Sequence, residues 1–162
     1  MIEGTHLSEG RGTTLPLEMF GAPKIDPQKV LKEMANINSK FSVGCHIRPC
    51  YFEPTFHKHN GEVCGGLQVH VDFPGYSPCQ FKPYRLVATY FKAVRNLYPE
   101  LEIWKQPPYE YEYEKLPIDI LSGNDQLRNW VDDKVSQFHD YNEYLIKDES
   151  QWSEESREFY LY

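Results

Sequence analysis

Apolar residues recur at helical spacing in two stretches of the chain, residues 26–40 and residues 83–98. The apolar positions are Val30, Leu31, Met34 and Ile37 in the first stretch, and Leu86, Tyr90, Val94 and Leu97 in the second. Residues three, four and seven apart share one face of an α-helix, so both stretches predict amphipathic helices. Asp26 can cap the first helix, and Pro27 and Pro83 suit the first turn of each.

A third helical pattern fills the C-terminal part of the chain. Its apolar positions are Leu127, Trp130, Val131, Val135, Phe138 and Leu145. They predict a long helical region that Asn124 or Asp125 can cap, with room for a break near Ser150. Residues 117–123 begin with proline and end with glycine, and they predict a turn that leads into this region.

Between the first two helices the apolar residues alternate with polar ones, which is typical of β-strands. Residues 41–56 predict an interrupted strand, and Pro49 and Pro54 place its second half at an edge, a bulge or a turn. Asn60-Gly61 predicts a type I′ hairpin turn. A second strand is expected at residues 63–72.

The second strand has two distinct faces. Leu67, Val69 and Val71 point to one side, and the other side carries Gly66, Gln68, His70 and Asp72. The Gly65-Gly66 pair indicates a bulge or a close approach of another backbone segment. Residues 101–104 are expected to form a short strand, and so are residues 109–114, where tyrosine and glutamate alternate strictly.

Helices mixed with a hairpin-based sheet predict the α+β class, with a small antiparallel, possibly mixed sheet packed by helices. The 162 residues are expected to form one domain with a substantial core.

Charge and hydropathy exclude several classes of partner. The net charge of −7 and the pI of about 5.4 argue against binding to nucleic acid and to anionic membranes. The sequence contains no run of about 18 apolar residues, so no membrane-spanning helix is expected. The first residues lack the basic and apolar regions of a signal peptide, so none is expected in this chain.

The four cysteines are Cys45, Cys50, Cys64 and Cys79. They form no Cys-x-x-Cys pair, which argues against a structural zinc site. Two disulfides in an exported protein and buried free thiols both remain open.

The opening segment, residues 3–23, is unusually rich in glycine, charge and hydroxyl groups. It contains Gly4, Gly10, Gly12 and Gly21, the charged residues Glu3, Glu9 and Arg11, and the hydroxyls of Thr5, Ser8, Thr13 and Thr14. Such a loop can present N–H groups and a bidentate arginine to an oxygen-rich ligand. It is neither a P-loop nor a dinucleotide fingerprint. A glycine-rich loop held by its own side chains is the alternative.

Three further groups are candidate sites. Gln68, His70 and Asp72, joined by Arg48 from the facing strand, can line a cleft or form a solvated outer face. His57 and His59 lack a third ligand of suitable spacing, so no metal is assigned, and they are interpreted as the solvated lead-in to the Asn60 turn. The tyrosines at positions 109, 111 and 113 are interpreted as core residues, with a sugar-stacking platform as the alternative.

Several phrases occur in an order that resembles one known family. The first are Glu-Gly-Thr-x-Leu-Ser-x-Gly-Arg-Gly-Thr-Thr-x-Pro, which begins at Glu3, and Phe-Gly-Ala-Pro, which begins at Phe20. Later phrases are Arg48-Pro-x-x-Phe52-x-Pro54-Thr-Phe56, Cys64-x-Gly66-x-Gln68-x-His70-Val71, and the segments 109–121 and 157–162. Together they resemble the C-terminal domain of the NamZ-like exo-β-N-acetylmuramidases. His6 and Lys24 depart from the usual pattern, which has asparagine and an aromatic residue there.

The resemblance implies that this chain corresponds to half of a two-domain glycoside hydrolase. The catalytic carboxylates are then expected in a Rossmann-like N-terminal domain that the chain lacks, so no residue here is assigned to catalysis and no cofactor is expected. Glu3 and Glu9 are not assigned as the catalytic pair, because a flexible loop supports two carboxyls poorly. The expected substrate-binding residues are Glu3, Arg11, Gly12, Thr13, Arg48, Gln68 and His70.

The expected partners are peptidoglycan fragments that contain N-acetylmuramic acid, together with the Rossmann-like domain. By family resemblance the protein is expected to be exported, to the periplasm or the extracellular space. The alternatives are a non-catalytic carbohydrate-binding or protein-interaction module, and a fragment without activity of its own.

Overall fold

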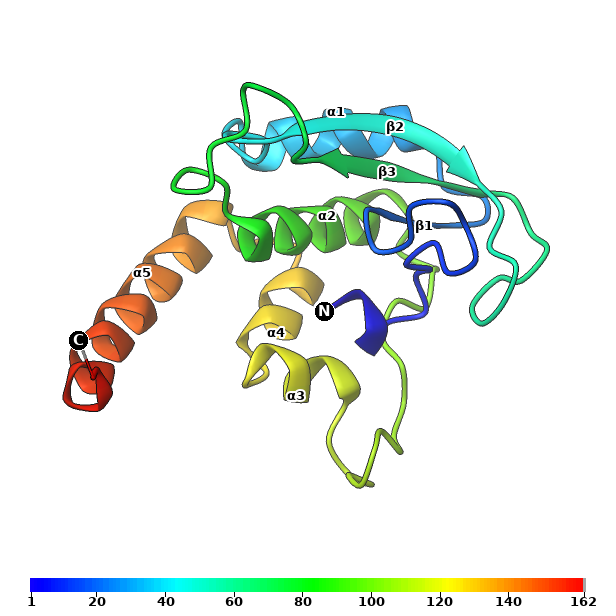
Figure 1. Ribbon diagram of the computed structural model, residues 1–162. Helices are drawn as coiled ribbons and strands as arrows, with labels where there is room; N and C mark the ends of the chain where they lie inside the picture. The colour runs from blue at the N-terminus through cyan, green and yellow to red at the C-terminus, as the bar shows by residue number, and fades with distance from the viewer. Residues whose placement is uncertain (162) are drawn as a thin grey trace.

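The computed structural model describes residues 1–161, and it has the α+β architecture that the sequence predicts. Three antiparallel strands form one sheet in the order β1-β3-β2. The strands are β1 (Met19–Ala22), β2 (His46–Phe52) and β3 (Cys64–His70), and the α-helices are α1 (Pro27–Ile37), α2 (Pro83–Leu97), α3 (Pro117–Ser122), α4 (Gln126–Asp132) and α5 (Phe138–Glu155). Short 3-10 turns occupy Ile2–Gly4 and Ser156–Phe159. Figure 1 shows α1 and α2 beside the sheet and α5 directed away from it.

The two amphipathic helices are confirmed, with the predicted cap. The Asp26 carboxylate accepts hydrogen bonds from the backbone N–H groups of Gln28 and Lys29, at 3.0 and 3.2 Å. This satisfies two donors that the first turn of α1 leaves without intrahelical partners. The buried stripes of the helices, with Val30 and Met34 on one and Tyr90 on the other, belong to the main hydrophobic core.

The two faces of the sheet have different surroundings. Phe20 and Leu67 lie opposite each other on β1 and β3, and they join the core formed with α1 and α2. The Phe20 ring contacts Tyr90 of α2 edge to face, with 4.7 Å between centroids. Because side chains alternate along a strand, Gln68 and its neighbours across the sheet point to the other face. That face carries a smaller apolar cluster of Met19, Cys50, Phe52 and Cys64.

The close backbone approach predicted for the Gly65-Gly66 pair is confirmed. A Cβ atom on Gly65 would lie 2.0 Å from the carbonyl oxygen of Ile25, and one on Gly66 would lie 2.1 Å from that of Phe20. The pairing of β3 continues through both glycines without an extra residue, so the bulge alternative does not apply. Side chains at these positions would push β1 and the start of α1 away from the central strand.

The predicted first strand is only partly correct. Residues 41–45 form turns, and β2 begins at His46. Pro49 lies within β2, which is an edge strand, as its missing N–H requires. Strand β1 was not predicted at all, because four residues inside a glycine-rich segment give too short a pattern.

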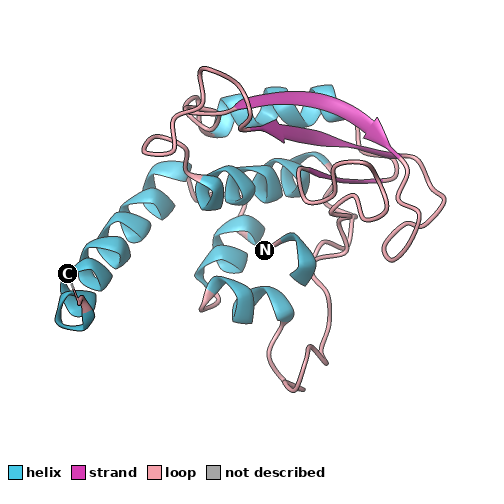
Figure 2. Cartoon of the chain, viewed as in Figure 1, coloured by secondary structure: helices cyan, strands magenta, loops and turns pink. Residues whose placement is uncertain are grey.

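The predicted type I′ hairpin turn at Asn60-Gly61 is wrong. Strands β2 and β3 do pair antiparallel, but residues 53–63 connect them, and of the two turn residues only Gly61 has positive φ, at 74°. A type I′ turn needs positive φ at both. The long connection instead turns toward the opening segment at one end of the sheet (Figure 2), and the backbone N–H of Thr55 donates to the carbonyl oxygen of Arg11 at 3.1 Å.

The strands predicted at residues 101–104 and 109–114 are also absent from the described chain. Trp104 forms an isolated bridge with Thr5, and Tyr109 and Glu112 close a tight turn. Tyr111 and Tyr113 are 91% and 73% exposed, so their interpretation as core residues is wrong. Strict alternation produces a strand only where a partner strand is available, and this segment lies away from both edges of the sheet.

The C-terminal region has more breaks than predicted. Residues 117–122, where a turn was predicted, form the short helix α3. Residues 133–137 separate α4 from α5. Gln137 and Asp140 form a capping box that starts α5, and the Trp130 indole donates to the carbonyl oxygen of Gln137 at 3.1 Å. No break occurs near Ser150, whose hydroxyl bonds the carbonyl oxygen of Ile146 within the helix.

All four cysteines are free thiols, and burial raises the pKa of the Cys64 thiol to about 11. None of the described helices is both long enough and apolar enough to cross a membrane. Tyr162, the last residue of the family-like C-terminal phrase, lies outside the described residues.

The close approach at Gly66 predicts a large effect of a single methyl group. We expect Gly66→Ala to lower the free energy of unfolding by about 2–3 kcal/mol, because the methyl group would meet backbone rather than a movable side chain. Chemical denaturation measures this change. Ser153→Ala, at an exposed position of α5, is the control and should change the value by less than about 0.5 kcal/mol. Equal stability of the two variants would contradict the close packing of β1 on β3.

Candidate functional site

The opening segment pairs with β1 through its backbone and turns sharply at two glycines. Ser8 exchanges hydrogen bonds with Gly21 of β1, at 2.7 and 3.0 Å. Gly10 and Gly12 have φ of 69° and 80°, a region that glycine adopts without strain. Between them the chain turns back, and Thr13 donates to the carbonyl oxygen of Gly10 through both its N–H and its hydroxyl.

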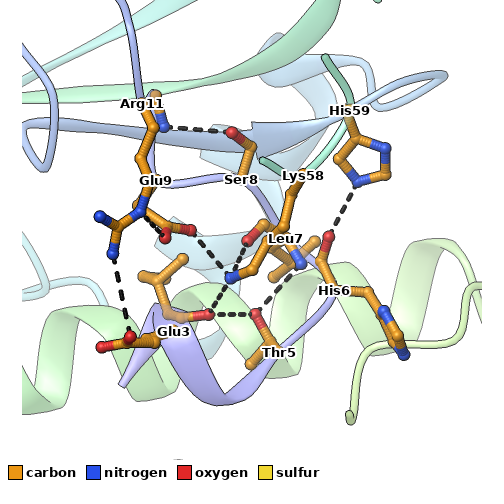
Figure 3. A network of polar contacts seen from close by, with 11 residues as sticks. Glu3, Thr5, His6, Leu7, Ser8, Glu9, Arg11, Lys58 and His59 are labelled. Carbon is orange, nitrogen blue, oxygen red and sulfur yellow. Dashed lines mark hydrogen bonds and ion pairs between the residues drawn. The ribbon is translucent and has the colours of Figure 1, made fainter. Parts of the chain in front are cut away.

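The Lys58 ammonium group is the centre of a buried polar network (Figure 3). It donates to the backbone carbonyls of Ile2 and Leu7, at 3.0 and 2.9 Å, and to the carboxylate of Glu9 at 2.8 Å. The side chains of Lys58 and Glu9 are 12% and 6% exposed. The lysine comes from the connection between β2 and β3, so one side chain fixes that connection to the opening segment. The interpretation of residues 57–59 as a solvated lead-in therefore holds for His57, which is exposed, and is wrong for Lys58 and His59.

The network continues from the buried carboxylate to the surface. The second oxygen of Glu9 accepts from Arg11 Nε at 2.6 Å. Another nitrogen of Arg11 lies 3.8 Å from Glu3. The exposed fraction of the side chains rises from 6% at Glu9 to 33% at Arg11 and 53% at Glu3. The positive and negative side chains of this network therefore alternate from the buried Lys58–Glu9 pair to Glu3 at the surface.

Burial and ion pairing shift the pKa values of Glu9 and Lys58 in opposite directions. Burial opposes ionisation of Glu9, but the hydrogen bonds from Lys58 and Arg11 outweigh it and hold the pKa of Glu9 below its ordinary value. Burial lowers the pKa of Lys58, and the Glu9 carboxylate counteracts that shift. Three oxygen acceptors around the ammonium group favour its charged form.

A second polar cluster lies on the sheet face that points away from α1 and α2. Arg48 of β2 is opposite Gln68 of β3, and its guanidinium donates to the Gln68 amide oxygen. Arg48 Nε also donates to His70 Nε2 at 3.1 Å. Gln68 is 1% exposed, whereas Arg48 is exposed. The structure therefore brings Arg48, Gln68 and His70 together as expected. Asp72, the fourth residue singled out, lies beyond the end of β3; it is 3.7 Å from His70 Nδ1, and its side chain is 85% exposed.

Two residues of this second cluster were missed by sequence reasoning. Glu18, just before β1, lies 3.5 Å from the Gln68 amide nitrogen. His46 pairs with His70 across β2 and β3, and their ring centroids are 6.0 Å apart. The strand signal for His46 was present, because it lies two residues before Arg48 and so on the same face. Glu18 had no such signal, since β1 was not predicted.

The predicted site residues thus fall into two clusters. Glu3 and Arg11 belong to the Lys58 network, and Arg48, Gln68 and His70 form the second cluster. No hydrogen bond or ion pair joins the two clusters directly among residues 1–161. Gly12 and Thr13 serve the turn of the opening segment, and the Gly12 carbonyl accepts from the Thr55 hydroxyl at 3.3 Å.

Neither cluster resembles a metal centre. In the described part of the chain, no three side chains of histidine, cysteine, aspartate or glutamate gather as a ligand set. His59 instead bonds the backbone carbonyl of His6 at 2.8 Å. The chemistry available is recognition of oxygen-rich or anionic groups, by Arg11 at one cluster and by Arg48 at the other.

Comparison with known proteins identifies the family. Residues 1–162 match the family described as exo-beta-N-acetylmuramidase NamZ, C-terminal. The chain belongs to this family. It is also 32% identical, over 163 aligned positions, to the peptidoglycan beta-N-acetylmuramidase NamZ of Bacillus subtilis strain 168, a match that covers 100% of this chain and 35% of the relative. The resemblance inferred from the motifs is therefore confirmed.

A solved structure shows the same fold. A DUF1343 family protein from Bacteroides fragilis superposes with a TM-score of 0.69 at 22% sequence identity, covering 97% of this chain and 38% of the other. This chain therefore spans about a third of the length of both relatives.

The buried ion pair predicts a strong and pH-dependent effect on stability. We expect Lys58→Met to lower the free energy of unfolding by about 3–5 kcal/mol, because it leaves the Glu9 carboxylate buried without its main partner. The double variant Lys58→Met/Glu9→Gln should lose less than the sum of the single losses. Additive losses in chemical denaturation would contradict the coupling.

The lowered pKa of Glu9 sets the direction of the pH effect. Its contribution to stability is present above the unfolded-state pKa, about 4.3, and disappears as the pH falls through the lower folded-state pKa. We expect the wild type to lose stability below about pH 4 more steeply than Glu9→Gln. Parallel stability curves for the two proteins would show that Glu9 is not the group concerned.

Proposed function

We propose that this chain is the C-terminal domain of a peptidoglycan-degrading glycoside hydrolase that releases terminal N-acetylmuramic acid from cell-wall fragments. The match of the whole chain to the NamZ C-terminal family carries the proposal. The relative from Bacillus subtilis, which is named a peptidoglycan beta-N-acetylmuramidase, supports it. Because peptidoglycan lies outside the cytoplasmic membrane, the proposal implies an exported protein.

In the proposed enzyme this domain contributes one wall of the cleft and part of the sugar recognition. The acid and base that hydrolysis requires come from the Rossmann-like domain outside this chain. The network around Lys58 supports this division, because Glu9 is neutralised by two cations and cannot act as a proton donor. The exposed groups suited to substrate are Glu3 and Arg11 at one cluster and Arg48 at the other.

A non-catalytic carbohydrate-binding or protein-interaction module is the second candidate. The observation in its favour is the exposure of Tyr111 and Tyr113 on the segment that follows Trp104. Aromatic rings exposed to this extent can stack on sugar rings or pack against a partner protein. Such a module would bind glycan fragments without contributing to their hydrolysis.

An activity assay distinguishes the two candidates. Alone, the chain should not hydrolyse a chromogenic N-acetylmuramide, because it lacks the catalytic carboxylates. Mixed with the matching N-terminal domain, it should restore turnover. A mixture without this chain is the control. Robust hydrolysis by the isolated chain would overturn the placement of the carboxylates, and an active N-terminal domain that gains nothing from this chain would favour the binding module.

Substitution of Arg11 tests its role in substrate binding. If Arg11 makes a charge-assisted bond to substrate, Arg11→Ala in the assembled enzyme should cost about 1.5–3 kcal/mol of transition-state stabilisation, roughly a ten- to hundred-fold loss of kcat/KM. The thermal midpoint is measured alongside, because Arg11 also bonds Glu9. A lower midpoint with unchanged kcat/KM would assign Arg11 to the loop alone.

A further inference from the structure

The hydrogen bond between Arg48 and His70 defines the protonation state of the imidazole. An arginine guanidinium is always charged and has only donors. His70 Nε2, 3.1 Å from Arg48 Nε, must therefore be the acceptor. The proton of the neutral ring is then on Nδ1, which lies 3.7 Å from the Asp72 carboxylate. The observed contact requires a neutral His70.

Protonation of His70 and the contact with Arg48 exclude each other. An imidazolium ring has a donor on both nitrogens, so Nε2–H would face the Arg48 N–H. A carboxylate placed between the two groups would remove this conflict, because each of its oxygens can accept from one cation. Arg48 favours such a ligand through its planar fork of donors.

The surroundings hold Arg48 in place for this role. Gln68, 1% exposed, accepts from one end of the guanidinium, and Glu18 lies 3.5 Å from the Gln68 amide nitrogen. Arg48 Nη1 has no hydrogen-bond partner among the described residues. A fixed guanidinium with an available edge binds an anion at a lower entropic cost than a mobile one.

The charged groups around His70 are few. From β2 they are Arg48 and His46, whose ring centroid is 6.0 Å from that of His70. From its own strand the group is Asp72, 85% exposed. Glu18 acts only through Gln68. Protonation of His70, and of His46 beside it, makes this patch cationic in a chain of net charge −7.

We propose that Arg48, His70 and His46 form a carboxylate-binding site in which binding of the anion is coupled to uptake of a proton by His70. The imidazole Nε2 gains a proton from solvent, its bond from Arg48 breaks, and the carboxylate accepts from both groups. The arrangement of Arg48, His70 and His46 indicates an anion site, and this indication does not depend on the proposed function. The proposed function enters only in the identity of the natural ligand, for which the lactyl carboxylate of N-acetylmuramic acid has the required chemistry.

Acetate is the probe, and acetamide is its uncharged control. Binding to the isotopically labelled chain is followed by NMR at about pH 5.5 and about pH 8, on either side of the ordinary histidine range near 6.5. We expect acetate, and not acetamide, to shift the Arg48 and His70 side-chain resonances. Coupling to one proton raises Kd by up to about tenfold per pH unit above that range, so binding should weaken by about ten- to thirtyfold at the higher pH.

Two variants separate the parts of the proposal. Arg48→Met should abolish the acetate shifts at both pH values, whereas Arg157→Met, an exposed arginine elsewhere, should leave them unchanged. His70→Gln keeps an acceptor for Arg48 and cannot titrate, so its acetate binding should lose most of its pH dependence. The backbone spectrum of each variant reports whether the sheet is intact.

Several results would overturn the proposal. They are equal binding of acetamide, a wild-type Kd that does not change with pH, pH dependence that survives in His70→Gln, and shifts scattered over other cationic residues, which would indicate an adventitious ion only. N-acetylmuramic acid is then compared with N-acetylglucosamine, which lacks the carboxylate. Acetate binding without a preference for N-acetylmuramic acid over N-acetylglucosamine would support the site and count against the proposed function. Hydrolysis on mixing the two domains, without acetate binding by this chain, would support the proposed function and count against the site.

Discussion

The buried ammonium group of Lys58 is the interaction on which the polar end of the molecule depends. It joins two loops that are distant in the sequence, through two backbone carbonyls and the carboxylate of Glu9. A buried charge is costly unless it is paired and hydrogen-bonded. Here the acceptors are Glu9 and the Leu7 carbonyl in the opening segment, and the Ile2 carbonyl just before it. The conformation of that segment, and with it the position of Arg11, therefore depends on the connection between β2 and β3.

The sheet divides the molecule into a supporting side and a polar side. One face packs on α1 and α2 and buries Phe20 and Leu67 with the main core. The other face carries a small apolar cluster at one end and the arginine-centred cluster at the other. Three strands with one helix-covered face suffice for stability. On the second face most side chains are buried as well, but Arg48 and His46 are exposed and available for recognition.

The two clusters differ in how much of their charge is already compensated. In the Lys58 network each cation has a carboxylate partner, so its main effect is to hold the loop. In the second cluster Arg48 contacts a neutral amide and a neutral imidazole, so its positive charge has no direct counter-ion among its hydrogen-bond partners. That difference makes Arg48 the better candidate for an anionic ligand.

The sequence by itself determined the elements whose signals are local. Helix α1 with its Asp26 cap, helix α2 and the shared face of Gln68 and His70 follow from periodicity and capping. The antiparallel pairing of β2 with β3 was also predicted, although the turn type assumed between them is wrong. The tertiary structure decided the rest. Strand β1 exists because β3 offers it an edge, residues 109–114 form no strand because no edge is near, and Lys58 is buried because the opening segment supplies its acceptors. Contacts between residues distant in the sequence leave no periodic signal, so no local pattern could have placed them.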